Sequence, residues 1–387
     1  MSKASVATPR QATRVDPCLP RNHEVHCLRV LIAAFSARYA LGQLLDGMFG
    51  ALAPRLQCQV LVPTNYKGNI PEQFIFRARC GTSKAGGLLG SINPLAHWDT
   101  IRALWRSRPN VVHILAGEGY VWAVTLTVAA RLAGIPVIVT LHDPEPHPGN
   151  VFEYLNSIVR RPVLALVRTI HLLSSQHVAK ARMLGHHARI AVVPHGSLAA
   201  QFTKYCSRNV QRERLVLFFG RIQSYKGIDV LLRALSLLPA NIRLAIAGPG
   251  AIEPPIWQMA QSLGSRVELH NRYLDDREVA LLMQRASVVA LPYRHATQSS
   301  VPAIAAAFGC QLVASALGHF NEEIPRLGGI LVPPEDPDAL ASALAAALQR
   351  GAMTPVVMQT FDELAPDFIN LYASTLGSCH GLCRPSE

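Results

Sequence analysis

Short apolar runs alternate with amphipathic segments along most of the chain. Runs typical of buried parallel strands occupy residues 28–35, 57–62, 111–115, 136–141 and 190–194, and helical spacing of apolar residues marks 44–52 and 121–132. Strands that alternate with helices assemble into a parallel sheet with helices on its faces. The first half of the chain is therefore predicted to be a doubly wound α/β domain.

The same alternation starts again after a polar, charged stretch at 201–213. Strands are expected at 215–219, 242–247, 267–270, 286–291 and 311–314, helices at 227–238, 278–284 and 337–348, and a last segment at 366–376. In open parallel sheets, ligands bind outside the carboxyl ends of the strands. Two such halves would thus face each other across a central cleft that holds the ligand.

A length of 387 residues suits two domains of ordinary size. The predicted divisions are a disordered leader at 1–27, a first Rossmann-like domain at 28–200, a linker at 201–213, a second Rossmann-like domain at 214–350 and a C-terminal segment at 351–387. We expect this last segment to pack partly back on the first domain.

The net charge of +12 at pH 7 is concentrated in the first half of the chain. Residues 1–200 hold 21 Lys and Arg against 9 Asp and Glu, whereas the remainder holds 16 of each kind. This excess predicts an anionic partner for the first domain. The basic residues are scattered and form no aromatic–basic cluster, so we expect no nucleic acid and favour an anionic membrane surface or a phosphorylated lipid. A merely soluble basic surface is the alternative.

Neither a secretory signal nor a membrane span is expected. Residues 1–27 lack an apolar core, and the longest apolar stretch, 120–141, is interrupted by an arginine, a glycine and a proline. Eight cysteines without a spacing framework favour reduced thiols in the cytoplasm. Cys379 and Cys383 make an incomplete set of metal ligands with the histidine between them, and Asp275 and Asp276 are typical of a helix N-cap, so no metal site is expected.

The segment from 219 to 232, Phe-Gly-Arg-Ile-Gln-Ser-Tyr-Lys-Gly-Ile-Asp-Val-Leu-Leu, carries the strongest chemical signal. Gly220 lets the backbone turn closely after a strand, and Arg221 and Lys226 flank the loop before a helix. A pyrophosphate needs positive charge and free backbone N–H groups, and a helix N-terminus with two cations supplies both. An ordinary basic loop with solvated side chains is the alternative.

This Gly-Arg-x4-Lys-Gly-x-Asp-x-Leu pattern resembles the donor-diphosphate loop of family-four glycosyltransferases, the large retaining group with the GT-B fold. Segments 244–250, 286–293 and 329–340 resemble further motifs of that family in the same order. The resemblance implies two Rossmann-like domains around a central cleft, a nucleotide diphosphate-sugar as donor, and no cofactor. It adds Gly248, in a glycine turn after the next strand, to the donor-binding residues with Gly220, and it makes Arg221 and Lys226 catalytic.

In the first half, a polar segment with His142, Asp143 and His147 follows the strand at 136–141. The resemblance places His142 at a strand end beside the transferred sugar, where its ring could donate to a hydroxyl or to developing charge and act in catalysis. A histidine that caps the strand and bonds to the backbone is the alternative. Asp143 and His147 are expected on the acceptor side, together with Gly42, the one glycine left where the family has a pair.

The sequence departs from the family at its Glu-x7-Glu motif, because Ala296 and Ile304 occupy the two glutamate positions. The loop resembles that of a subgroup with Ala-Thr-Gln-Ser-Gly, whose hydroxyls, amide and N–H groups suit phosphate and sugar. An ordinary capped helix is the alternative, and the departure leaves the stereochemical outcome open. The donor-binding residues expected in this loop are Thr297, Gln298, Ser299 and Ser300.

A further donor contact is assigned to Glu322, which with Glu323 stands where the family has a Gly-Gly-x-x-Glu turn; a solvated carboxylate is the alternative. The function implied is transfer of a hexose to a membrane-associated, lipid-linked saccharide in polysaccharide biosynthesis, by a cytoplasmic enzyme at the inner face of the membrane. No metal is required, because cations and helix N-termini would neutralise the diphosphate. A non-catalytic GT-B scaffold or partner subunit and a nucleotide-sugar epimerase are the alternatives.

Overall fold

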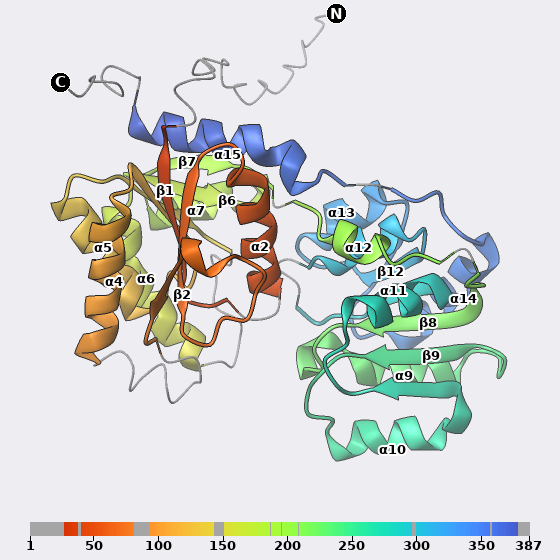
Figure 1. Ribbon diagram of the computed structural model, residues 1–387. Helices are drawn as coiled ribbons and strands as arrows, with labels where there is room; N and C mark the ends of the chain where they lie inside the picture. Colours follow the sequence, from red (N-terminus) through yellow and green to blue (C-terminus); the bar gives the residue numbers. More distant parts are fainter. Residues whose placement is uncertain are drawn as a thin grey trace, which may run out of the picture.

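The computed structural model describes residues 27–37, 40–80, 93–142, 151–185, 187–194, 196–207, 209–295, 299–356 and 358–377. Within them the chain forms two separate parallel sheets, each with helices on its faces (Figure 1). The doubly wound α/β prediction is therefore confirmed. The expected leader, Asp143, His147, Ala296, Thr297, Gln298 and the pair Cys379 and Cys383 lie outside the described residues, apart from the turn residue Cys27.

The first sheet has seven strands in the order β3-β2-β1-β4-β5-β6-β7. Its strands are β1 (Arg29–Ala34), β2 (Gln57–Pro63), β3 (Ile75–Ala78), β4 (Val111–Ala116), β5 (Val137–Thr140), β6 (Thr169–Leu172) and β7 (Arg189–Val192). Its helices are α2 (Ala40–Leu52), α4 (Pro94–Ser107), α5 (Val121–Leu132), α6 (Val151–Leu166) and α7 (Val178–Leu184). Figure 1 shows α4 and α5 on the side away from the second sheet and α2 on the side toward it. Because both faces are covered, every residue of β4 is buried.

The second sheet has six strands in the order β10-β9-β8-β11-β12-β13. Its strands are β8 (Glu213–Phe219), β9 (Arg243–Ala247), β10 (Val267–His270), β11 (Ala286–Leu291), β12 (Gln311–Ser315) and β13 (Ile330–Val332). Its helices are α9 (Ile228–Ser236), α10 (Pro254–Ser262), α11 (Asp276–Arg285), α12 (Val301–Ala307), α13 (Phe320–Arg326) and α14 (Pro337–Arg350). The Asp275 side chain caps α11 and forms a capping box with Glu278, so the N-cap prediction is confirmed.

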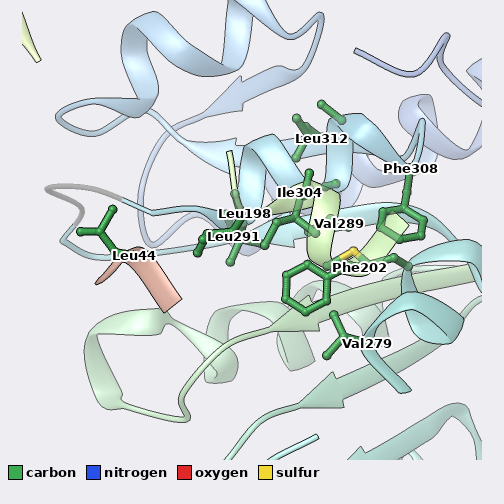
Figure 2. Close-up of a cluster of buried hydrophobic side chains, with 14 of the residues drawn as sticks. Leu44, Leu198, Phe202, Val279, Val289, Leu291, Ile304, Phe308 and Leu312 are labelled. Atoms are coloured by element: carbon green, nitrogen blue, oxygen red, sulfur yellow. The ribbon is translucent and has the colours of Figure 1, made fainter. Parts of the chain in front are cut away.

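The segment expected as a linker is partly structured. A short helix, α8 (Ala199–Thr203), includes its first residues, and Glu213 already belongs to β8. The apolar side chains of Leu198 and Phe202 explain the difference, because they are buried against the second domain and fix the local backbone. Figure 2 shows both side chains among Leu291 and Ile304 of that domain.

The last helix, α15 (Phe361–Leu376), packs on α2 and β4 of the first domain. It starts before Pro366, because Thr360 and Glu363 form a capping box one turn earlier. The ring of Phe361 fills the space beside two glycines: an added Cβ would lie 2.6 Å from it at Gly47 and 2.5 Å from it at Gly196. Because these glycines have no side chain, α15 can pack closely against the first domain.

A buried chain of hydrogen bonds also fastens α15. The carbonyl oxygen of Val193 only accepts, so His171 Nε2–H donates to it (2.8 Å) and His171 Nδ1 accepts from the Thr140 hydroxyl (2.9 Å). Thr140 must then accept from His113 Nε2–H (2.8 Å), and His113 Nδ1 accepts from the Tyr372 hydroxyl (3.0 Å). Both rings are neutral in this arrangement. Burial, together with the nearby His171 and His142, holds the pKa of His113 well below its ordinary value.

Among the helices described, none combines the length and the apolar character that a bilayer crossing needs.

Candidate active site

The candidate residues Gly220, Arg221, Lys226, Gly248 and Ser299 lie in the segments that follow β8, β9 and β11, where glycines allow backbones to touch. Gly220 and Gly248 have φ angles of 139° and 138°, and a Cβ at Gly248 would stand 2.1 Å from the Gly220 carbonyl oxygen. Gly227, with φ of 67°, would place a Cβ 1.9 Å from the Pro292 oxygen. Only glycine fits such approaches, so these three turns form one rim at the carboxyl edge of the sheet.

Lys226 extends its ammonium group over aromatic rings at this rim. Its Nζ lies 3.7 Å from the ring centroid of Tyr293 and 5.3 Å from that of Tyr225. Burial lowers the Lys226 pKa to about 8; Tyr225 opposes the shift, and the nearby charge of Arg221 adds to it. Within the described part of the chain, Lys226 has no ion pair with a carboxylate. The site therefore holds a partly buried cation that an anion would stabilise.

Tyr293 completes this space. Its side chain is 1% exposed, and its hydroxyl has no hydrogen-bond partner among the described residues. Burial raises the pKa of Tyr293; the nearby Ser299 hydroxyl opposes this rise only weakly, since it is too poorly placed to form a hydrogen bond with Tyr293 Oη. A Cβ built on Gly220 would lie 4.0 Å from both the Lys226 Nζ and the Tyr293 Oη. The glycine therefore leaves open a space that a cation and a hydroxyl donor both face.

Arg294 binds the loop after β11 to the loop after β8. Its guanidinium donates to both carboxylate oxygens of Asp229 (2.9 and 2.8 Å), to Glu335 (2.7 Å) and to the Ser224 carbonyl (2.8 Å). Burial works to raise the pKa of Asp229, but hydrogen bonds from Arg294 and Arg233 outweigh it and leave the pKa lowered. The Lys226 loop is thus held in place from a neighbouring strand.

This cluster includes residues that sequence reasoning missed. Asp229 and Tyr293 were noted only as parts of motifs, and Arg294, 65 positions after Asp229, was assigned no role. The available signal was an aromatic and a basic residue directly after a buried strand. Their partners could not be identified before the strand order was known.

The position of the second family glutamate is part of the hydrophobic core here. Ile304 is 2% exposed and packs near Val289, Leu291 and Leu312 (Figure 2). Ser299 Oγ accepts from the Val301 N–H at 3.3 Å, just before α12. The apolar surroundings explain why an isoleucine is stable at this position, where a carboxylate would be buried.

The two adjacent glutamates of α13 have different environments. The Glu322 side chain is 45% exposed and lies 3.7 Å from Arg326, one turn further on. The Glu323 side chain is 11% exposed, its Oε2 lies 3.3 Å from His319 Nε2, and burial raises its pKa to about 7. Glu323 is therefore the carboxyl group directed toward the protein interior. Donor binding by Glu322 stays a prediction.

In the first domain, the structure places His142 and Gly42 at the carboxyl edge of the sheet. His142 follows β5, and its Nε2–H donates to the Leu115 carbonyl of β4 at 2.7 Å. In the neutral ring this tautomer leaves Nδ1 as an acceptor. Gly42 lies in the first turn of α2, where a Cβ would stand 2.9 Å from the Ala37 oxygen.

Two family models and several known proteins match the chain. A family model described as Glycosyl transferase 4-like domain matches residues 6–196, and one described as Glycosyl transferases group 1 matches residues 213–350. The chain is 29% identical to a D-inositol 3-phosphate glycosyltransferase of Xylanimonas cellulosilytica over 64% of its length and 68% of that protein. It is 32% identical to the protein of that name from Mycolicibacterium gilvum, of which the match spans 49%.

Solved structures share the fold over most of the chain. Sucrose-phosphate synthase from Thermosynechococcus elongatus superposes with a TM-score of 0.64 and 16% identity, covering 90% of this chain and 96% of that one. HepE from Anabaena, determined in complex with UDP, gives a TM-score of 0.64 and 16% identity over 90% and 97% of the two chains. The two-domain GT-B architecture is therefore confirmed.

Proposed function

The chain belongs to the family-four glycosyltransferases of the GT-B fold, and from this membership we propose that it transfers a hexose from a nucleoside diphosphate sugar to a lipid-linked saccharide at the cytoplasmic face of a membrane. The observation that carries the donor half of this proposal is Lys226, a partly buried cation with a lowered pKa and no carboxylate partner among the described residues. A diphosphate supplies the missing negative charge.

The chemistry follows from where charge develops. As the anomeric C–O bond breaks, negative charge grows on the phosphate of the leaving nucleoside diphosphate. The Lys226 ammonium and the Arg221 guanidinium would neutralise that charge, and the unpartnered Tyr293 hydroxyl would donate to a phosphate oxygen. Arg294 would act indirectly, because it holds the loop that carries Lys226. Neutralisation by these groups needs no divalent ion.

The acceptor half of the proposal depends on charge distribution. All of the excess positive charge lies in residues 1–200, the part of the chain that carries His142 and Gly42. A basic first domain would attract anionic lipid headgroups and the phosphate of a lipid-linked saccharide. Retention of the anomeric configuration is proposed from family membership alone.

A non-catalytic scaffold is the second candidate, favoured by Ala296 and the buried Ile304 at the positions of the family glutamates. A scaffold could bind the nucleotide without turnover. Release of nucleoside diphosphate from a sugar donor, measured with and without membrane extract, distinguishes an enzyme from a scaffold. No release under either condition would support the scaffold. Interconversion of two donor sugars without an acceptor would indicate an epimerase instead.

The donor assignment is tested by thermal shift with a panel of nucleoside diphosphates, since a ligand bound only by the folded state raises the melting temperature. We expect one member of the panel to raise it, and Lys226→Met to abolish the shift. Lys204→Met is the matched control, because Lys204 also lies over an aromatic ring, 4.9 Å from the centroid of Tyr205, but outside the site. An unchanged shift in Lys226→Met would disprove the assignment.

A further inference from the structure

Helix α4 presents its largest side chains to solvent. Leu95, Trp98, Arg102, Trp105 and Arg106, here called the α4 aromatic face, fall within an arc of about 100° at 3.6 residues per turn. Leu95 and Trp98 are each 50% exposed and Trp105 is 60% exposed. The two indole rings pack edge to face with centroids 5.7 Å apart.

The buried side of the same helix is made of smaller residues. The buried residues of α4 are Ala96, Thr100, Ala103, Leu104 and Ser107. A helix that needs only to cover a sheet buries its aromatic residues and exposes polar ones. In α4 the aromatic residues are the exposed ones, so the tryptophans contribute little to the core and are available to a partner.

The exposed charges around the α4 aromatic face are positive. Helices α4 and α5 contain a single carboxylate, Asp99, which is 10% exposed and bonded to Arg79 at 2.7 Å. Arg102 and Arg106 are exposed among the tryptophans. On α5, which is joined to α4 by a hydrogen bond between His97 and Thr125 (2.7 Å), the exposed end adds Arg131 and the 84% exposed Leu132.

We propose that the α4 aromatic face docks the protein on an anionic lipid surface, an inference that rests on the proposed transfer to a membrane-associated acceptor. Tryptophan favours the membrane–water interface, where its ring is in the apolar boundary and its N–H stays hydrated. Arg102 and Arg106 then meet lipid phosphates beside the two rings. A helix with apolar and cationic residues on one face binds such a surface without any groove.

The position of α4 suits this role. It lies on the side of the first sheet away from the second domain (Figure 1), so lipid contact leaves the Lys226 loop clear of the surface. Because α4 leads into the amino end of β4, it begins near the carboxyl edge of the sheet. His142 lies at that edge, so the end of the face formed by Leu95 and Trp98 is near the acceptor side, whereas Trp105 and Arg106 lie toward the amino edge of the sheet.

The test is binding to vesicles of phosphatidylcholine with and without about a third of phosphatidylglycerol, measured by sedimentation at several salt concentrations. We expect binding only to the anionic vesicles, weakening as salt rises. The double substitution Arg102→Gln with Arg106→Gln should weaken binding to the anionic vesicles about 25-fold, because each arginine near the surface contributes a factor of about five. The matched control is Arg326→Gln with Arg350→Gln, two exposed arginines of the second domain.

Tryptophan fluorescence gives a second, independent readout. Of the four tryptophans, Trp122 is buried and Trp257, 44% exposed, lies on α10 of the second domain. Brominated lipids should quench wild-type emission, and Trp257→Ala should leave both quenching and sedimentation intact. Trp98→Ala with Trp105→Ala should abolish the quenching and most of the binding. Equal vesicle binding by wild type and this double variant would overturn the proposal.

The outcome is kept separate from that of the proposed function by measuring the nucleoside diphosphate thermal shift on the same samples. Nucleotide binding without vesicle binding would refute the docking face alone. Vesicle binding without any nucleotide binding or turnover would refute the proposed transfer while the docking face stands. Self-association without lipid that is lost in the tryptophan double variant would show that a second copy covers the face, and would also overturn docking.

Discussion

The lowered pKa of Lys226 predicts that nucleoside diphosphate binding weakens as pH rises above 8. In the free protein the group loses its proton near pH 8, whereas a bound diphosphate should return the pKa toward the ordinary 10.5. The complex then holds more protons than the free protein between these two values, so binding is lost with increasing pH. From pH 7.5 to 9.5 the protonated fraction of Lys226 falls about 25-fold, and affinity should fall about 20-fold.

Isothermal titration of the nucleoside diphosphate between pH 7.5 and 9.5, in buffers of different ionisation enthalpy, measures both affinity and proton uptake. Uptake should approach one proton at pH 9. The phosphate itself is fully ionised over this range, since its second pKa is about 6. Affinity that is constant up to pH 9.5, or the same pH dependence in Lys226→Met, would refute the reasoning. Lys204→Met should behave as wild type.

Four further predictions follow from particular contacts. Arg294→Gln removes the ion pair between Arg294 and Asp229, whose side chains are 29% and 20% exposed. We expect the free energy of unfolding to fall by about 2 kcal/mol, intermediate between exposed and buried pairs, and nucleotide binding measured by calorimetry to weaken. Nucleotide binding equal to wild type would disprove the positioning role. Ile304→Glu buries a carboxylate and should cost about 3 kcal/mol or more in urea unfolding, with Ile304→Val as control; a stable variant with tighter nucleotide binding would contradict this. Donor turnover should stay within about twofold in excess EDTA; a loss restored by Mg²⁺ or Mn²⁺ would argue against the cation assignment. The pKa of His113 is lower in the folded than in the unfolded protein, so the unfolded chain takes up a proton first as pH falls below 6.5. His113 should therefore lower the free energy of unfolding by about 1.4 kcal/mol per pH unit in this range. An equally steep loss in His113→Gln would exclude His113 as the cause.

Much of the fold could be predicted because its central strands are buried on both faces. The apolar runs at β1, β4 and β9 predict buried strands with little ambiguity. The start of the helix after Asp275 could be predicted because local hydrogen bonds of a capping box define it. Helix α4 was missed for a physical reason: its tryptophans face outward and its alanines inward, so its apolar pattern opposes the usual signal. β3 and β6 were also missed, although β5, β7 and β10, which are equally short, were predicted.

The sequence alone determined the local composition of the loop after β8, because a strand, Gly220, two cations and a following helix are contiguous and need no distant partner. Tertiary structure decided what surrounds that loop. Tyr293 lies under Lys226, and Arg294 reaches Asp229, only because β11 is placed beside β8. It also decided which of two adjacent glutamates is buried, since successive helix residues point about 100° apart and only packing fixes which direction is inward.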